Sequence, residues 1–140
     1  MALPMQYETR YYWSGESKNG DLEIDERPAL PMGAPIDTRV FNPEHLLLAA
    51  SEVCLANTFF AIAESSRLKF TAYRSHAEGE LEFVEREGYR FHDILITVKI
   101  RLNASDEDKA RRILDKAHDA CLIARSLNFP VRMKAEFLTD

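Results

Sequence analysis

Two cysteines are the residues of this sequence with the most distinctive chemistry. Cys54 falls midway along a long apolar segment, and Cys121 lies on the apolar stripe of a later segment. A pair of thiols can carry redox chemistry, in which one thiolate attacks an oxidant and the other resolves the product as a disulfide. Buried cysteines are also common as small core hydrophobes. From the residues alone, both interpretations stay open.

A reactive thiol at Cys54 needs electrostatic help. The thiolate is the nucleophile, and burial alone favours the neutral thiol. The neighbouring acid Glu52 would hinder ionisation further. We therefore expect a functional Cys54 to depend on an arginine or a similar cation that the fold brings from another segment.

The four histidines are the other candidate groups. His118 lies three residues before Cys121, close enough on a helix to stabilise a thiolate, and His45 adjoins Glu44. The remaining two fall on expected strands. The sequence has no C-x-x-C motif and no cluster with metal-ligand spacing. We expect no metal and no organic cofactor.

The long apolar segment is predicted to be a helix. Asn42 can cap it, Pro43 suits its first position, and Glu44 complements the positive end of its dipole. The helix should run over residues 43–66 and is apolar on nearly all sides. Its length would be roughly 36 Å at about 1.5 Å per residue, more than a chain of 140 residues can surround. We therefore expect a second subunit to cover part of it.

The remaining pattern predicts strands and one more helix. Strands are expected at residues 5–13, 20–25, 73–85, 91–102 and 131–138, and a proline-rich loop at residues 27–38. Ser105 should cap a second helix that ends before Pro130. The order β-β-α-β-β-α-β predicts an α+β fold with two core helices packed on an antiparallel sheet.

Composition narrows the class of protein. The 140 residues carry a net charge of −5, and 46% of them are hydrophobic, which is typical of a single globular domain over residues 1–140. Scattered basic residues argue against a nucleic-acid partner. Polar residues interrupt the apolar stretch 46–63, so we expect no membrane span, and nothing at the start resembles a signal peptide. A cytoplasmic location is expected, where the cysteines would rest as thiols.

Two segments resemble a known family. The run Asn42–Ala50, followed by Cys54, is similar to the N-P-E-x-L-L-x-A-A signature of the OsmC/Ohr superfamily of hydroperoxide reductases. The run Ala117–Ile123 is similar to the A-x-x-x-C-P-V segment of that family, with Leu122 in place of the proline. The order of elements matches along nearly the whole chain. The resemblance implies the OsmC-like fold, an intertwined homodimer and an antioxidant role in the response to oxidative stress.

The resemblance also implies a mechanism, namely thiol-dependent reduction of organic hydroperoxides. Cys54 would attack the peroxide and become a sulfenic acid, and Cys121 would resolve it as a disulfide. A dithiol, such as a lipoyl group, would then reduce that disulfide. Glu44 and an arginine would complete the site, because a guanidinium can stabilise both the thiolate and the peroxide oxygens.

The arginine is where this chain departs from the family pattern. The Ohr branch carries it in a G-G-R-D-G turn, whereas residues 14–20 here contain no arginine. The OsmC branch carries it in an N-T-R segment, which Asp37–Arg39 resembles, although Arg39 lies only five residues before Glu44. Arg39 is therefore the candidate carried over, with Arg27 and Lys18 as alternatives.

Helix geometry adds a constraint. Glu44 and Cys54 would lie about 15 Å apart along one straight helix, too far to share a site. Two copies crossing antiparallel near Ala49 and Ala50 would bring Glu44 of one chain level with Cys54 of the other; a break in the helix is the alternative.

A rival function is a non-catalytic dimeric module that binds a hydrophobic small molecule. A hydrolase using Cys54 lacks a well-placed histidine base.

Overall fold

The structure is a computed structural model that describes residues 3–15 and 17–139. The chain forms two compact units with their boundary between Leu47 and Leu48. Each unit has its own three-stranded sheet. The α+β class is confirmed. The single domain over residues 1–140 stays a prediction.

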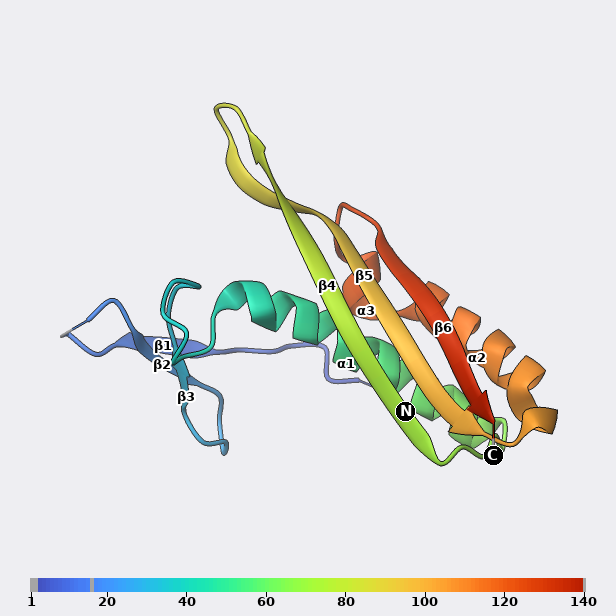
Figure 1. Cartoon of the computed structure of the whole chain (residues 1–140). Helices are drawn as coiled ribbons and strands as arrows, with labels where there is room; N and C mark the ends of the chain where they lie inside the picture. Colours follow the sequence, from blue (N-terminus) through green and yellow to red (C-terminus); the bar gives the residue numbers. More distant parts are fainter. Residues whose placement is uncertain (1–2, 16, 140) are drawn as a thin grey trace. The chain divides into compact units, whose positions relative to one another are not determined.

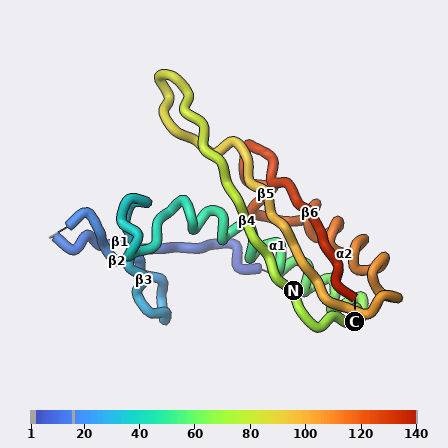
Figure 2. Tube along the Cα trace, viewed as in Figure 1, coloured from blue at the N-terminus to red at the C-terminus, as the bar shows by residue number. Residues whose placement is uncertain are grey.

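The N-terminal unit is built on an antiparallel sheet of strand order β1-β2-β3 (Figure 2). Its strands are β1 (Arg10–Trp13), β2 (Gly20–Glu23) and β3 (Leu30–Met32). The first two were expected, but β1 begins at Arg10 and not at residue 5. Consecutive strands pair in an antiparallel way, as short connections allow.

Strand β3 lies inside the segment predicted to be a loop, so that prediction was wrong there. Pro31 pairs with Asp21 in the β2–β3 register. Its carbonyl faces away from β2 and accepts a hydrogen bond from the Phe41 amide at 3.2 Å. Because β3 is an edge strand, the N–H that proline lacks is not needed by β2.

The C-terminal unit has a mixed sheet of order β4-β5-β6 (Figure 1). Its strands are β4 (Ala72–Val84), β5 (Gly88–Leu102) and β6 (Val131–Thr139), and β4 and β5 form the predicted hairpin. The expectation of an antiparallel sheet was wrong for β6, which runs parallel to β5. The reason is the helical connection between these two strands, which returns the chain to the same end of the sheet, as parallel pairing requires.

Helix α1 (Pro43–Ser65) confirms the predicted helix and shows no break. The side chain of Asn42 accepts a hydrogen bond from the His45 amide at 2.7 Å, so the predicted cap is confirmed. By length and composition alone α1 could cross a membrane, a test that core helices of soluble proteins also pass.

The second predicted helix is divided. It comprises a short 3₁₀ turn η1 (Ala104–Asp106), α2 (Glu107–Ala120) and α3 (Leu122–Arg125), with Cys121 in extended conformation between the two α-helices. The predicted Ser105 cap was wrong. The side chain of Asn103 accepts a hydrogen bond from the Ser105 amide instead. The reason is that the first turn is a 3₁₀ turn whose cap lies at Asn103, two residues before the predicted cap.

The core of the C-terminal unit lies between its sheet and its helices, which share one face of the sheet in Figure 1. Alternate residues of β5 are almost fully buried there, as period-two patterning requires. The helices contribute small and large apolar side chains to the same cluster. These buried residues are Ile94, Ile96, Val98, Ile100 and Leu102 of β5, Leu55, Phe59 and Ala63 of α1, and Ala110, Ile113, Leu114 and Ala117 of α2.

Candidate functional site

The two cysteines meet in the C-terminal unit. Both are free thiols, with Cys54 half-buried on α1 and Cys121 buried to 2% exposure. Burial raises the pKa of the Cys121 thiol, and a side-chain hydrogen bond with Cys54 raises it further. Nearby backbone amides of Ala124 and Ile123 oppose this shift without cancelling it. Two thiols that the sequence places far apart therefore lie close enough to influence each other.

The position of Cys121 follows from the break between α2 and α3. Its backbone is extended, with φ −62° and ψ 114°, and its amide donates to the His118 carbonyl at 3.3 Å. The break occurs even though Leu122 follows the cysteine and not proline. The imidazole Nε2 of His118 lies 2.7 Å from the Val131 carbonyl oxygen, which ties the end of α2 to the start of β6. His118 thus has a structural partner beside Cys121.

Tyr73 on β4 is a further residue that interacts with Cys121. Its hydroxyl is buried and has no hydrogen-bond partner among the described residues. Burial, followed by the charges of Glu52 and Cys121, raises the pKa of Tyr73 to about 12. The phenol therefore stays protonated at neutral pH and is available as a hydrogen-bond donor.

Glu52 lies on the same side of the C-terminal unit. Its carboxylate accepts a hydrogen bond of 2.5 Å from the Ser75 hydroxyl. Ser75 and Tyr73 are two residues apart on β4, so their side chains leave the same face of the strand. Through Ser75, the strand thus holds Glu52, the acid two residues before Cys54. The charge of Glu52 also acts on the Tyr73 phenol.

The other predicted site residues belong to the N-terminal unit. Glu44 lies in the first turn of α1, and its Oε1 is buried without a hydrogen-bond partner among the described residues. Arg39 is 85% exposed and forms a two-pronged ion pair with Asp37, at 2.9 and 3.0 Å. That pairing raises the pKa of Arg39 and lowers that of Asp37. No ion pair joins Arg39 to Glu44 within residues 3–15 and 17–139.

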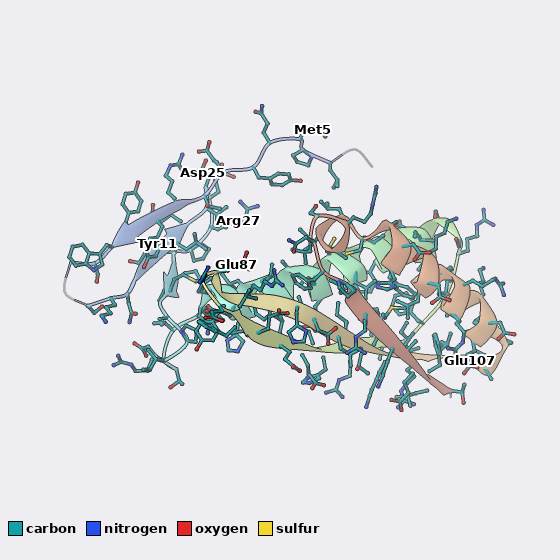
Figure 3. All side chains as sticks on the ribbon, turned by 90° about the horizontal axis from the view of Figure 1, so that it is seen from above. Met5, Tyr11, Asp25, Arg27, Glu87 and Glu107 are labelled. Atoms are coloured by element: carbon teal, nitrogen blue, oxygen red, sulfur yellow. The ribbon has the colours of Figure 1, made fainter. Side chains whose placement is uncertain are left out.

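The two alternative cations also lie in the N-terminal unit. Arg27 follows Asp25 after the end of β2, and its guanidinium donates to the Asp25 carbonyl at 2.9 Å (Figure 3). Lys18 lines an apolar hollow of about 310 Å³, together with Tyr11, Leu22, Met32, Gly33 and Pro43. Neither contacts Glu44 through an ion pair in the part of the chain that the structure describes.

Sequence reasoning did not identify Tyr73 and Ser75 as site residues. The ring of Tyr73 packs on Phe59 and Phe60, with ring centroids 5.5 and 5.1 Å away. The only signal was alternation along the strand, which places both residues on the face toward the helices. Among the described residues, no group of His, Cys, Asp and Glu could hold a metal ion.

Comparison with known proteins supports the family. A family model described as OsmC-like protein matches residues 37–136, and no curated protein sequence matches significantly. An OsmC-like protein of unknown function from Vibrio cholerae superposes with a TM-score of 0.83 at 18% identity, covering 95% of this chain and 100% of that one.

Two other solved structures carry functional names. An organic hydroperoxide resistance protein OsmC from Legionella pneumophila superposes with a TM-score of 0.75 at 19% identity, covering 99% of both chains. The organic hydroperoxide resistance protein OhrB of Bacillus subtilis gives 0.68 at 16% identity, covering 95% of this chain and 98% of that one. At such identities the likeness concerns the fold. Together with the family match over 37–136, it shows that this chain belongs to the OsmC-like family of the OsmC/Ohr superfamily.

Proposed function

We propose that this protein is a thiol-dependent peroxidase that reduces organic hydroperoxides to alcohols. The observation that carries the proposal is the proximity of the Cys54 and Cys121 thiols, which is close enough for Cys54 to raise the pKa of Cys121. Cys54 is the more accessible of the two, so an oxidant reaches it first. Burial keeps Cys121 as a neutral thiol until an oxidised sulfur forms beside it. These environments suit an attacking and a resolving cysteine.

The chemistry balances with two thiols and an external dithiol. The Cys54 thiolate attacks the terminal peroxide oxygen, the O–O bond breaks, and the alkoxide takes up a proton and leaves as the alcohol. The Cys121 thiol then attacks the sulfenic sulfur, an S–S bond forms, and the oxygen leaves as water. A dithiol of the dihydrolipoyl class returns both cysteines to thiols and is itself oxidised to a cyclic disulfide.

We also propose a role for Glu44 and a cation of the N-terminal unit. A guanidinium would stabilise the Cys54 thiolate and the peroxide oxygens, and the carboxylate of Glu44 would hold that guanidinium in place. Support comes from the buried, unpartnered Oε1 of Glu44, since a buried carboxylate oxygen normally has a partner. Arg39 is the first candidate, and it would have to leave Asp37 to take that place.

A homodimer and a cytoplasmic location are further parts of the proposal. Only four residues of α1 are buried in the single chain, while Val53 is 56% exposed and Phe60 is 41% exposed. A second copy covering α1 would remove such apolar side chains from water. It would also let Glu44 of one chain approach Cys54 of the other. Light scattering should then give about twice the chain mass of 16.1 kDa.

The proposal is tested by peroxide consumption with dihydrolipoamide or dithiothreitol as reductant. Cys54→Ser should abolish turnover, and Cys121→Ser should accumulate a sulfenic acid that a dimedone probe traps. Arg39→Ala should lower the rate. A loss of rate in Arg27→Ala or Lys18→Ala instead would assign the cation to that residue. A rate no greater than that without protein, with both thiols unreactive, would favour the rival function, a dimeric module binding a hydrophobic small molecule.

A further inference from the structure

The hydroxyl of Tyr73 is unexplained by packing alone. Its ring fills space between the rings of α1, where phenylalanine would pack equally well. The oxygen is nevertheless buried with no hydrogen-bond partner among the described residues. A buried hydroxyl left without a partner costs about 1–3 kcal/mol, so a protein that needed only a ring would gain by omitting it. This hydroxyl therefore points to a partner that is formed at another stage of the protein's cycle.

The surroundings of the hydroxyl identify that stage. The Tyr73 ring packs on Phe59 and Phe60 of α1. Ser75, on the same face of β4, bonds to Glu52 of α1, so the phenol faces the stretch of the helix that carries Cys54. The charge of Cys121, which itself interacts with Cys54, also acts on the phenol. Glu52 also acts on the phenol, but its carboxylate is engaged by the Ser75 hydroxyl at 2.5 Å. The reduced sulfurs are weak hydrogen-bond acceptors. An oxygen atom added to one of them would be a much stronger acceptor.

We propose that the Tyr73 hydroxyl donates a hydrogen bond to the sulfenic oxygen of Cys54 and assists its departure during disulfide formation. The inference rests on the proposed peroxidase function. In this step the sulfur of Cys121 bonds to the sulfur of Cys54, the S–O bond breaks, and the oxygen leaves with its own proton and that of Cys121 as water. Tyr73 keeps its proton throughout. Its donor stabilises the negative charge that develops on the departing oxygen.

This role separates the two steps of the reaction. The first step, attack on the peroxide, places charge on the alkoxide that leaves, and Tyr73 is not needed for it. The second step depends on departure of the oxygen from the sulfur of Cys54, for which a buried neutral donor is well suited. Removing the donor should therefore slow resolution and leave sulfenic acid formation unchanged.

The test is Tyr73→Phe, which removes only the oxygen atom. Reduced protein is mixed with one equivalent of cumene hydroperoxide, quenched with an alkylating agent at successive times, and analysed by mass spectrometry for thiols and disulfide. Disulfide formation should slow by about ten- to a hundredfold, the effect of losing one hydrogen bond to a charged group. Sulfenic acid formation, measured with dimedone in the Cys121→Ser background, should change less than about twofold on adding Tyr73→Phe.

Two controls give the result its meaning. Tyr89→Phe makes the same chemical change at a site that is 76% exposed, and it should leave both steps unaltered. Diamide oxidises the same two thiols without forming a sulfenic oxygen, so Tyr73→Phe should not slow disulfide formation by diamide.

The inference is overturned if Tyr73→Phe resolves the sulfenic acid as fast as the parent protein. Equal slowing with peroxide and with diamide would also overturn it, because the hydroxyl would then act only on the geometry of the cysteines. Failure of the proposed function looks different. In that case the parent protein forms a disulfide with diamide but neither sulfenic acid nor disulfide with the peroxide, and the inference falls with the function.

Discussion

Oxidation of the two cysteines should stabilise the folded chain, because the fold already brings their thiols close together. Cys54 influences the pKa of Cys121 although the two stand far apart in the sequence. A disulfide between them would close a loop of about 70 residues in the unfolded chain. The chain-entropy relation gives about 4 kcal/mol for a loop of that length. This figure assumes that the folded state accepts the bond without strain.

The expected gain in stability is large enough to measure by heating. For a chain of this size, about 1 kcal/mol moves the melting temperature by roughly 2–4 °C, so oxidation should raise it by about 10 °C. The assay compares thermal unfolding of the protein reduced with dithiothreitol and oxidised with diamide. Mass spectrometry under denaturing conditions confirms that the linkage lies within one chain.

The control for this prediction is Cys121→Ser, which cannot form the bond. It should show the same melting temperature before and after diamide. The reasoning is refuted if the intramolecular disulfide forms but the melting temperature stays level or falls, since the bond would then distort the fold. It is equally refuted if diamide produces only disulfides between chains.

Three further predictions concern the core and the ionisable groups. Phe59→Ala, at a side chain with no exposed surface, should lower the free energy of unfolding by about 3–5 kcal/mol in urea titrations. Alkaline absorbance titration should show one tyrosine ionising last, with a pKa of about 12, and Tyr73→Phe should remove that late component. Arg132 holds Asp93 in a two-pronged ion pair and lowers the pKa of its carboxyl. The stabilisation is present above the ordinary aspartate pKa, about 3.9, and is lost as the pH falls below it. The urea midpoint should therefore fall more between pH 5 and pH 3 in the parent protein than in Asp93→Asn; equal losses would contradict this.

Much of the fold could be predicted because its signals are local. Asn42 and Pro43 predicted the start of α1, and the alternation of apolar and polar residues predicted β4 and β5. The short strand β3 was missed because its proline is acceptable only at a sheet edge, and no local pattern tells which strand is an edge. The direction of β6 was missed for a similar reason, since it depends on the path of the helical connection.

The candidate site could be predicted only in part. The family signature identified Cys54 and Cys121 as the residues to examine. It could not show that they lie close together, because only tertiary packing brings α1 near the break between α2 and α3. Arg39 was selected from a three-residue resemblance, and the structure pairs it with Asp37 two residues away.

The sequence by itself determined the family, the α+β class and the identity of the two candidate thiols, because each of these depends only on residue types and their short-range spacing. Tertiary structure decided which groups surround those thiols. Segments distant along the chain bring Cys54 near Cys121 and place Ser75 against Glu52. They also bury the Tyr73 hydroxyl. Such contacts arise from the simultaneous packing of helices on a sheet, and that packing, together with the charges it brings close, determines the pKa of each group.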